Sequence, residues 1–381
     1  MPGTARKEQL GGYRDRPWIP RFWDGMTAGA WLRLLARNRF AVSPDRWPMA
    51  AVIAGVSLFN SGLARFQSAR LGSRIAQVCV EPQPIFILGH WRSGTTLLHE
   101  YLVLDQRHTS PDTYQCFMPS HHLVSRNVLA PVVGLLMPKK RPMDNMAAGW
   151  ERPQEDEFAL CNLGVPSPYL DIAFPARPQY PEYLTLEGLS AEAIERWKRS
   201  LIWFLQTVIL RDPRRLVLKS PPHTGRVRVL AELFPEAKFI HITRDPYVVF
   251  PSTVNLWQRL ARDQGLCRSE EGRWTEYVFE NLVRMYGAFE RDRRLLGSSQ
   301  LAEVRYEELT ADPIGEIGRI YEQLELGGFE MLLPRLRERA VQQSDYRRNR
   351  YSISAAMEAE IASRWGDFIE RYGYRGAQAA A

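Results

Sequence analysis

Residues 85–98 read Ile-Phe-Ile-Leu-Gly-His-Trp-Arg-Ser-Gly-Thr-Thr-Leu-Leu, and this stretch decides the fold. Its first four residues are all apolar, which predicts a strand covered on both faces of a sheet. Gly89 and Gly94 bound a short loop, and residues 95–104 have the apolar pattern of a helix. A strand that leads through a glycine-bounded loop into a helix predicts an α/β protein. In such proteins ligands bind at the carboxyl edge of the sheet.

The rest of the chain repeats this alternation of strand and helix. Strands are expected at 84–89, 215–219, 238–243 and 301–306, and helices at 95–104, 224–233, 247–260 and 313–324. Such alternation predicts a central parallel sheet with helices on both sides, which is a three-layer fold. Residues 1–83 have a helical pattern instead, and Glu81-Pro82-Gln83-Pro84 ends it sharply. We therefore predict an N-terminal helical extension at 1–83 and an α/β domain at 84–381.

The loop after the first strand predicts an anion site. Backbone N–H groups at the start of a helix face a ligand placed there, and the helix dipole favours negative charge. Gly89 and Gly94 have the separation of the nucleotide triphosphatase pattern GxxxxGK[ST], but Thr95 stands where that pattern has its lysine. None of the predicted strands ends in an aspartate that would hold magnesium. A P-loop nucleotide kinase or triphosphatase is therefore an alternative that lacks two of its usual side chains.

A second anion site is predicted at the end of the strand at 238–243. Arg244 follows this strand directly, and Ser252 comes eight residues later on the next helix. A guanidinium group can bind a phosphate through two parallel N–H bonds, and a serine hydroxyl can add a third. The pair therefore predicts a phosphate site at the same edge of the sheet as the first loop.

The two motifs together resemble those of the sulfotransferases that use 3′-phosphoadenosine 5′-phosphosulfate (PAPS), in particular a bacterial branch related to the tyrosylprotein and carbohydrate enzymes. The resemblance covers about residues 84–375 and implies a P-loop-like fold. It also implies transfer of a sulfuryl group by in-line displacement, without a metal. A non-catalytic nucleotide-binding protein is a further alternative. The resemblance assigns donor binding to three segments, through Arg92, Ser93, Gly94, Thr95 and Thr96, through Arg244 and Ser252, and through Arg347, Arg348 and Asn349. For the last of these segments, a solvated run of charges is an equal alternative.

Catalytic residues are expected around the transferred group. Arg92 lies in the loop that would hold the 5′-phosphate, so it can stabilise the charge that develops on the bridging oxygen. Lys219 ends its strand and resembles a lysine that some members of the family place near the transferred group.

The general base is expected in the acidic cluster at 153–158. Crowded carboxylates raise one another's pKa, which suits a base, and Glu155 and Glu157 are the candidates, ahead of Asp156. The alternative for this cluster is a helix N-terminus with acidic residues in its first turn. His121 and His122 are the alternative bases.

Composition limits the partners and the location. The net charge of +7 is spread along the chain rather than gathered in a basic tail, which argues against nucleic acid. The four cysteines are far apart, which disfavours disulfides and zinc and favours a cytoplasmic location. Residues 49–59 and 128–137 are apolar but shorter than a membrane span, so they are expected as core helices or as a peripheral membrane contact beside Lys139-Lys140-Arg141. The acceptor is expected to be a hydroxyl or amine of a small molecule, hydrophobic or lipid-like. Oligomeric state has no signature in the sequence.

Overall fold

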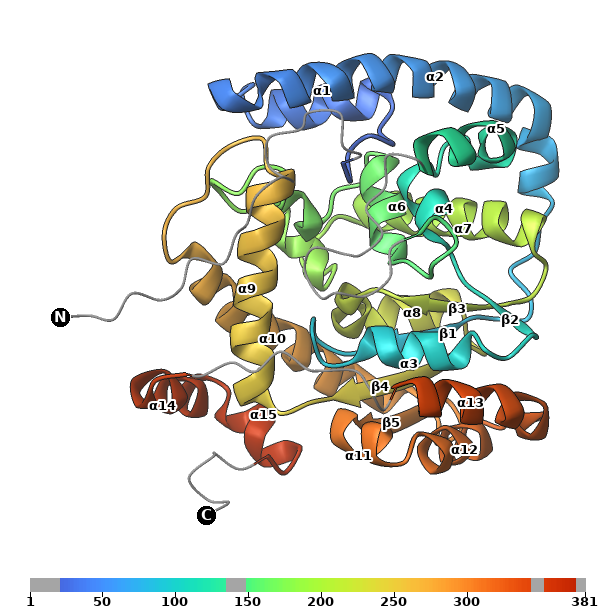
Figure 1. Ribbon diagram of the computed structural model, residues 1–381, viewed down its shortest axis with the longest axis vertical. Coiled ribbons are helices and arrows are strands. Elements are labelled where there is room, and N and C mark those ends of the chain that lie inside the picture. The colour runs from blue at the N-terminus through green and yellow to red at the C-terminus, as the bar shows by residue number, and fades with distance from the viewer. Residues whose placement is uncertain (1–20, 135–148, 344–352, 375–381) are drawn as a thin grey trace.

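A computed structural model describes residues 21–134, 149–343 and 353–374 (Figure 1). These residues contain a five-stranded sheet in the order β2-β3-β1-β4-β5, and every neighbouring pair is parallel. The strands are β1 Ile85–Leu88, β2 His108–Thr109, β3 Arg215–Lys219, β4 Lys238–Thr243 and β5 Leu301–Arg305. The four predicted strands are confirmed. β2 was missed because two residues carry no periodic signal.

Helices surround this sheet. Their bounds are α1 Ala28–Arg37, α2 Trp47–Ala76, α3 Thr95–Leu102, α4 Thr113–Phe117, α5 His122–Gly134, α6 Asp156–Asn162, α7 Ala191–Arg211, α8 Val227–Leu233, α9 Pro246–Gln264, α10 Arg273–Asp292, α11 Tyr306–Ala311, α12 Pro313–Gln323, α13 Phe329–Gln343, α14 Ala355–Arg364 and α15 Gly366–Arg371. Short 3₁₀ helices lie at Pro44–Arg46, Pro168–Asp171, Pro181–Leu184, Pro221–Arg226 and Arg293–Leu295. The helix predicted from residue 224 begins only at Val227, because Arg226 has a φ of −119°, outside the helical range.

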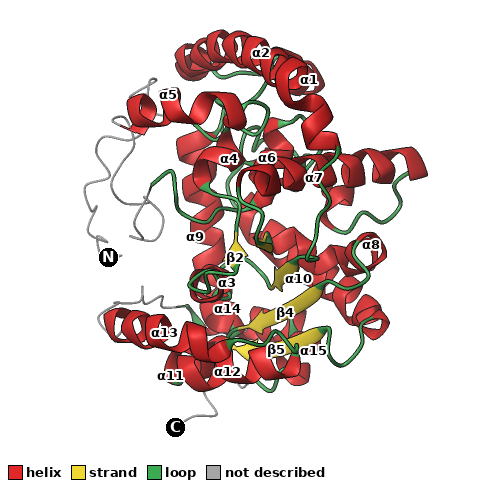
Figure 2. Ribbon diagram, turned by 90° about the vertical axis from the view of Figure 1, so that its right-hand side faces the viewer, coloured by secondary structure: helices red, strands yellow, loops and turns green. Residues whose placement is uncertain are grey.

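The two faces of the sheet pack against different helices. Successive side chains of a strand point to opposite faces, so Ile85 and Ile87 join a cluster with α3, α12 and α13. Phe86 and Leu88 join a larger cluster with α7, α8 and α10 on the other face. All four residues of β1 are therefore buried, and the strands lie enclosed among helices (Figure 2). This arrangement is the predicted three-layer α/β fold.

The N-terminal helices complete the larger cluster. Trp31 on α1 and Ile53 on α2 are buried together with Phe86 of the central strand. In Figure 1 both helices lie along one edge of the molecule, beyond α6 and α7. The described part of the predicted extension, residues 21–83, is mainly helical, and it shares its core with the α/β part. The boundary proposed after residue 83 stays a prediction.

One helix is longer and more apolar than the sequence analysis expected. Residues Pro44–Ala76 are long and apolar enough to cross a membrane by length and composition, and only 22% of their most apolar window is buried inside the protein. Ser57 and Asn60 interrupt the apolar run, which is why it was not counted as a span. Length and composition alone do not separate a span from a helix packed on a protein.

Candidate active site

The two predicted anion-binding segments leave the sheet side by side. β1 and β4 are parallel neighbours, with Leu88 opposite His241, so the loops that follow them share one edge. Gly89 and Gly94 have φ angles of +150° and +104°, which side chains rarely allow. A Cβ atom on Gly94 would lie 2.3 Å from the ring of Tyr306. Both the path of the loop and its close packing therefore require glycine at this position.

The loop is held in place before any ligand binds. The Ser93 hydroxyl donates to the carbonyl oxygen of His90 at 2.7 Å, and the Ser93 N–H donates to the same oxygen at 3.2 Å. From outside the loop, the Thr224 hydroxyl accepts the Gly89 N–H at 2.7 Å, and the Thr253 hydroxyl donates to the Trp91 carbonyl at 3.2 Å. These bonds fix the backbone that leads into α3.

The amides at the start of α3 provide the anion site. The first N–H groups of a helix have no partner within it, and they carry the positive end of its dipole. Gly94, Thr95 and Thr96 occupy these positions, whereas the Ser93 N–H is used by the turn. The amides of these three residues are therefore the ones that the helix orients toward an anion. Arg92 adds a positive φ of +69°, a strained conformation found most often at functional sites.

The structure brings the second anion-binding segment against this loop. Arg244 donates from Nη1 to the carbonyl oxygen of Arg92 at 3.1 Å, and its guanidinium lies over the Tyr306 ring, 4.1 Å from the centroid. The Nε of Arg92 donates to the hydroxyl of Ser252 at 3.0 Å. Three residues predicted from two segments about 150 positions apart therefore meet at one place.

A partly buried ion pair lies on the other side of the loop. Lys219 ends β3, which pairs with β1, and its Nζ donates to Glu155 Oε1 at 2.6 Å. The Tyr169 hydroxyl donates to the second Glu155 oxygen and accepts the Trp91 indole N–H at 3.0 Å. Burial raises the pKa of Tyr169 well above its usual value, with the Glu155 carboxylate adding to the shift, so Tyr169 stays a neutral donor. The network links the loop, through Trp91, to the predicted lysine and glutamate.

The other two acidic residues of the cluster point into the protein. Glu157 is fully buried and accepts from Arg226 at 2.6 and 3.0 Å. Asp156 is also fully buried and bonds to His223 Nε2 at 2.7 Å. Burial alone would raise the pKa of Asp156, but its contacts with His223 hold it below the usual value. The structure therefore does not bring Glu157 to the surface that Glu155 reaches.

Glu157 is expected to matter for stability. Glu157→Gln keeps the volume but leaves the Arg226 charge buried without its carboxylate, which should lower the free energy of unfolding by about 3–5 kcal/mol. Urea unfolding measures this. Glu195→Gln is the control, because Glu195 pairs with Lys198 at 3.4 Å on the surface and should cost about 1 kcal/mol or less. Equal effects of the two substitutions would contradict the structural role.

The alternative bases, His121 and His122, are buried in the protein. His121 bonds to Ser125 at 2.8 Å and Asn60 at 3.0 Å, and His122 bonds to Thr207 at 2.9 Å. Burial lowers the pKa of His121 to about 4 and that of His122 to about 3. Both side chains therefore act as neutral members of the packing between α5 and its neighbours.

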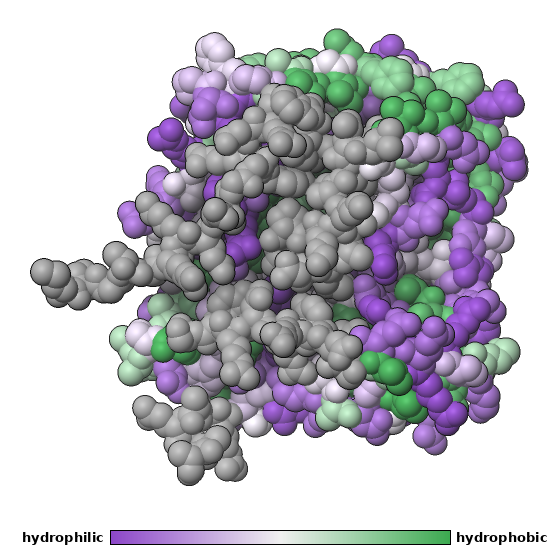
Figure 3. Space-filling model, viewed as in Figure 1, coloured by the Kyte–Doolittle hydropathy of each residue, from purple (hydrophilic) through white to green (hydrophobic). Residues whose placement is uncertain are grey.

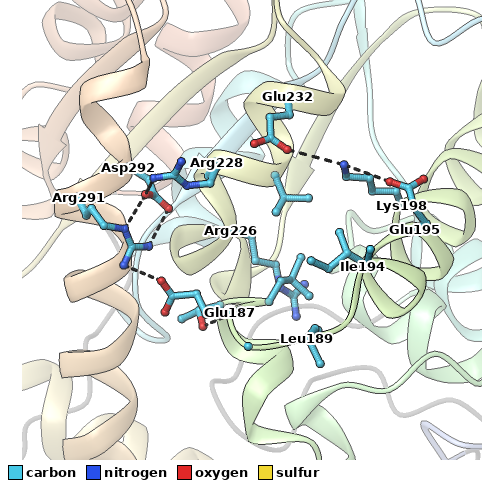
Figure 4. Close-up of a pocket in the computed structure, with 15 residues that line it drawn as sticks. Glu187, Leu189, Ile194, Glu195, Lys198, Arg226, Arg228, Glu232, Arg291 and Asp292 are labelled. Carbon is cyan, nitrogen blue, oxygen red and sulfur yellow. Dashed lines mark hydrogen bonds and ion pairs between the residues drawn. The ribbon is translucent and has the colours of Figure 1, made fainter.

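A separate cavity of about 580 Å³ lies beside Arg226, between α7, α8 and α10 (Figure 4). Its charged side chains already pair with one another. Arg291 bonds Glu187 at 2.6 Å, and Lys198 lies between Glu195 and Glu232 at 3.4 and 3.7 Å. Because these charges neutralise one another, this cavity is a poor site for an anionic donor.

Three predicted site residues are not described by the structure, and three residues of the site were not predicted from the sequence. Arg347, Arg348 and Asn349 lie outside the described residues. Tyr169 and Arg226 were missed, because nothing near them in the sequence marks their contacts with the acidic cluster. Trp91 was quoted within the loop but given no role.

Gly94→Ala is expected to distort the loop. The new Cβ would meet the Tyr306 ring and require a positive φ, so we expect a loss of stability of about 1–3 kcal/mol and weaker nucleotide binding. Gly287→Ala is the matched control. At this exposed position inside α10 an added Cβ meets open space, and the substitution should add about 0.5–1 kcal/mol of stability. Thermal unfolding with and without adenosine 3′,5′-bisphosphate measures both effects. A neutral Gly94→Ala would show that the loop conformation is not required.

The fold and site define an α/β protein with a glycine-bounded anion loop that lacks the lysine of nucleotide triphosphatases and has arginines on both anion-binding segments. A family model described as the sulfotransferase family matches residues 84–330. The chain belongs to this family and is a sulfotransferase.

Relatives and solved structures agree with this assignment. Two mycobacterial proteins, from Mycobacterium bovis and Mycobacterium tuberculosis, are 46% identical over 362 residues, which cover 95% of this chain and 93% of theirs. Both are named omega-hydroxy-beta-dihydromenaquinone-9 sulfotransferase Stf3. The sulfotransferase STF9 from Mycobacterium avium has a similar fold, with a TM-score of 0.62 and 20% identity over 91% of this chain and 96% of that one. The sulfotransferase STF1 from Mycobacterium tuberculosis H37Rv has a TM-score of 0.59 and 18% identity over 89% and 90% of the two chains.

Proposed function

We propose that this sulfotransferase takes its sulfuryl group from PAPS and transfers it to a hydroxyl group of a lipid-like acceptor. The observation that carries the proposal is the contact of the Arg244 guanidinium with the Arg92 carbonyl, 3.1 Å away, beside the first amides of α3. Two anion-binding segments that leave neighbouring strands and contact each other suit a nucleotide that carries phosphates at both its 5′ and 3′ positions.

Each phosphate has its own set of donors in this proposal. The amides of Gly94, Thr95 and Thr96 bind the 5′-phosphate, where the dipole of α3 adds favourable charge. Arg244 and the hydroxyl of Ser252 bind the 3′-phosphate. Arg92 reaches Ser252 with its Nε, so it lies between the two positions.

The transfer step needs one bond made and one broken at sulfur. An acceptor oxygen forms a bond to sulfur while the bond from sulfur to the bridging oxygen of the phosphosulfate breaks, and adenosine 3′,5′-bisphosphate leaves. Arg92 and Lys219 stabilise the charge that develops on that oxygen. Glu155 accepts the proton of the acceptor hydroxyl, and its contacts with Lys219 and Tyr169 orient it. Glu157 is buried against Arg226, so in this proposal it stabilises the segment that carries Glu155 and does not touch substrate.

The acceptor class is proposed from the relatives. The two proteins at 46% identity carry a hydroxylated menaquinone in their names. A match over nearly the whole of both chains supports an acceptor of the same chemical class, an isoprenoid lipid that ends in a hydroxyl group.

Transfer of label from ³⁵S-PAPS tests the proposal directly. Purified protein is incubated with labelled PAPS and a short ω-hydroxylated prenyl quinone in EDTA, and the product is separated by chromatography. We expect label in the quinone without added metal. A thermal-shift comparison of adenosine 3′,5′-bisphosphate, AMP and Mg-ATP accompanies it, and the first should stabilise the protein most. Stabilisation by Mg-ATP alone, with no transfer, would favour the kinase alternative.

A further inference from the structure

Three uncharged polar side chains of the long helix α2, those of Ser57, Asn60 and Gln67, face the rest of the protein and are buried. Asn60 is buried and donates to the carbonyl oxygens of Asp24 at 2.6 Å and Met26 at 3.1 Å, while its other side-chain atom bonds His121 at 3.0 Å. Gln67 is also buried and accepts the N–H of Leu123 at 2.9 Å. A helix on the surface of a soluble protein usually has the opposite pattern, with apolar residues inside and polar residues outside.

The outward side of the same helix is apolar. The exposed fractions are 68% for Leu58, 62% for Trp47 and 54% each for Phe59 and Phe66. We call these four residues, together with Val52, the apolar face. Residues 47–64 contain no charged side chain at all. Green surface runs along this edge of the molecule in Figure 3, over α2. Exposed apolar residues gathered on one side of a helix mark a contact with another molecule or with a membrane.

The charges around the apolar face favour an anionic lipid surface as its partner. Arg65, Arg70 and Arg74 are exposed on the second half of α2, and residues 47–76 include no aspartate or glutamate. Basic residues beside an apolar helical face attract acidic lipid head groups, and an exposed tryptophan such as Trp47 suits the boundary between head groups and acyl chains. A two-fold contact with a second copy would bring two acid-free basic helices together, where like charges repel.

The inner contacts of α2 decide how it meets the membrane. A helix that spans the bilayer must present its whole circumference to lipid or to other spans, but the inner side of α2 is bonded through Asn60 and Gln67 to the rest of the protein. Only the outer side is available. We propose that α2 lies flat on an anionic membrane, with the apolar face at the boundary between head groups and acyl chains. This contact would place the enzyme at the surface from which a lipid acceptor is taken, but it does not depend on the donor chemistry.

Vesicle flotation tests the proposal. Full-length protein is mixed with vesicles of phosphatidylcholine alone or with 30% phosphatidylglycerol, and the bound fraction is measured after centrifugation through a sucrose gradient. We expect wild type to float with the anionic vesicles. Leu58→Asp combined with Phe59→Asp should reduce the partition coefficient on the order of 100-fold. The variant loses two apolar side chains that wild type inserts into the membrane, and two charges must enter the boundary between head groups and acyl chains instead. The combined Arg65→Gln, Arg70→Gln and Arg74→Gln variant should lose the preference for anionic vesicles.

Matched controls show whether the loss of flotation is specific to the apolar face or follows from changing any exposed apolar residue. Val283→Asp on α10 and Met331→Asp on α13 change side chains that are also more than half exposed, and both should float like wild type. Thermal unfolding without nucleotide should be cooperative in all variants, which shows that they are folded and keeps this test separate from that of donor binding.

Four results would overturn the proposal. Folded wild type that stays at the bottom of the gradient would exclude membrane binding, and flotation of the double aspartate variant equal to that of wild type would place the contact elsewhere. A lipid-free dimer that dissociates in the double aspartate variant would identify a second copy as the partner. Alkaline carbonate washing of cell membranes should release wild-type protein. Retention of the protein through this wash would indicate a membrane-spanning helix instead of a surface contact.

Discussion

Arg244→Ala is expected to remove most of the affinity for adenosine 3′,5′-bisphosphate while leaving the affinity for AMP almost unchanged. Hydrogen bonds to charged groups contribute about 1.5–3 kcal/mol each, and a guanidinium fork makes two with one phosphate. Their loss should raise the dissociation constant by a factor of about 10²–10⁴, but only for the nucleotide that carries a 3′-phosphate. Titration calorimetry of both nucleotides in EDTA measures this difference.

Two further variants make the Arg244 result specific. Arg244→Lys keeps the charge without the fork, so its affinity should fall between those of wild type and the alanine variant. Arg319→Ala removes an arginine that pairs with Glu316 at 2.6 Å on the surface of α12, and it should change neither affinity. If Arg244→Ala weakened the binding of adenosine 3′,5′-bisphosphate and AMP equally, Arg244 would only support the loop through its contact with the Arg92 carbonyl.

Glu155→Gln is expected to lower the rate of sulfuryl transfer by a factor of about 10²–10⁴, the usual contribution of a general base. Glutamine has nearly the same shape and can still contact Tyr169, but it cannot accept a proton. The dissociation constant for adenosine 3′,5′-bisphosphate should stay within about threefold of wild type, because Glu155 touches Lys219 and Tyr169 and not the anion loop. Single-turnover transfer from PAPS to an ω-hydroxylated prenyl quinone measures the rate.

The matched control for Glu155 lies four residues earlier. Glu151 has a side chain that is 92% exposed, and Glu151→Gln should leave the rate unchanged. Tyr169→Phe removes the hydroxyl that orients Glu155, so it should lower the rate less than Glu155→Gln while leaving nucleotide binding intact. An unchanged rate in Glu155→Gln would assign the base to another residue.

The sheet and the anion-binding segments could be predicted because their signals are local. Strands buried on both faces read as short apolar runs, as in 85–88 and 238–243, and the carboxyl ends of neighbouring parallel strands must meet at one edge. That rule predicts that Arg244 lies near the loop at 89–94. The 3.1 Å contact between Arg244 and the Arg92 carbonyl is its outcome.

The interior of the site could not be predicted because it depends on packing between distant segments. Glu155 and Glu157 are two residues apart and looked equivalent in the sequence. The fold turns Glu157 toward Arg226, 69 positions away, and leaves Glu155 beside Lys219. Similarly, residues 49–59 read as an apolar helix, but only the contacts of Asn60 reveal which side faces the protein.

A crystal structure with adenosine 3′,5′-bisphosphate tests the central claim most directly. We expect the 5′-phosphate on the amides of Gly94, Thr95 and Thr96, and the 3′-phosphate between the Arg244 guanidinium and the Ser252 hydroxyl. A nucleotide bound with its 3′-phosphate away from Arg244, or outside the edge formed by β1 and β4, would contradict it.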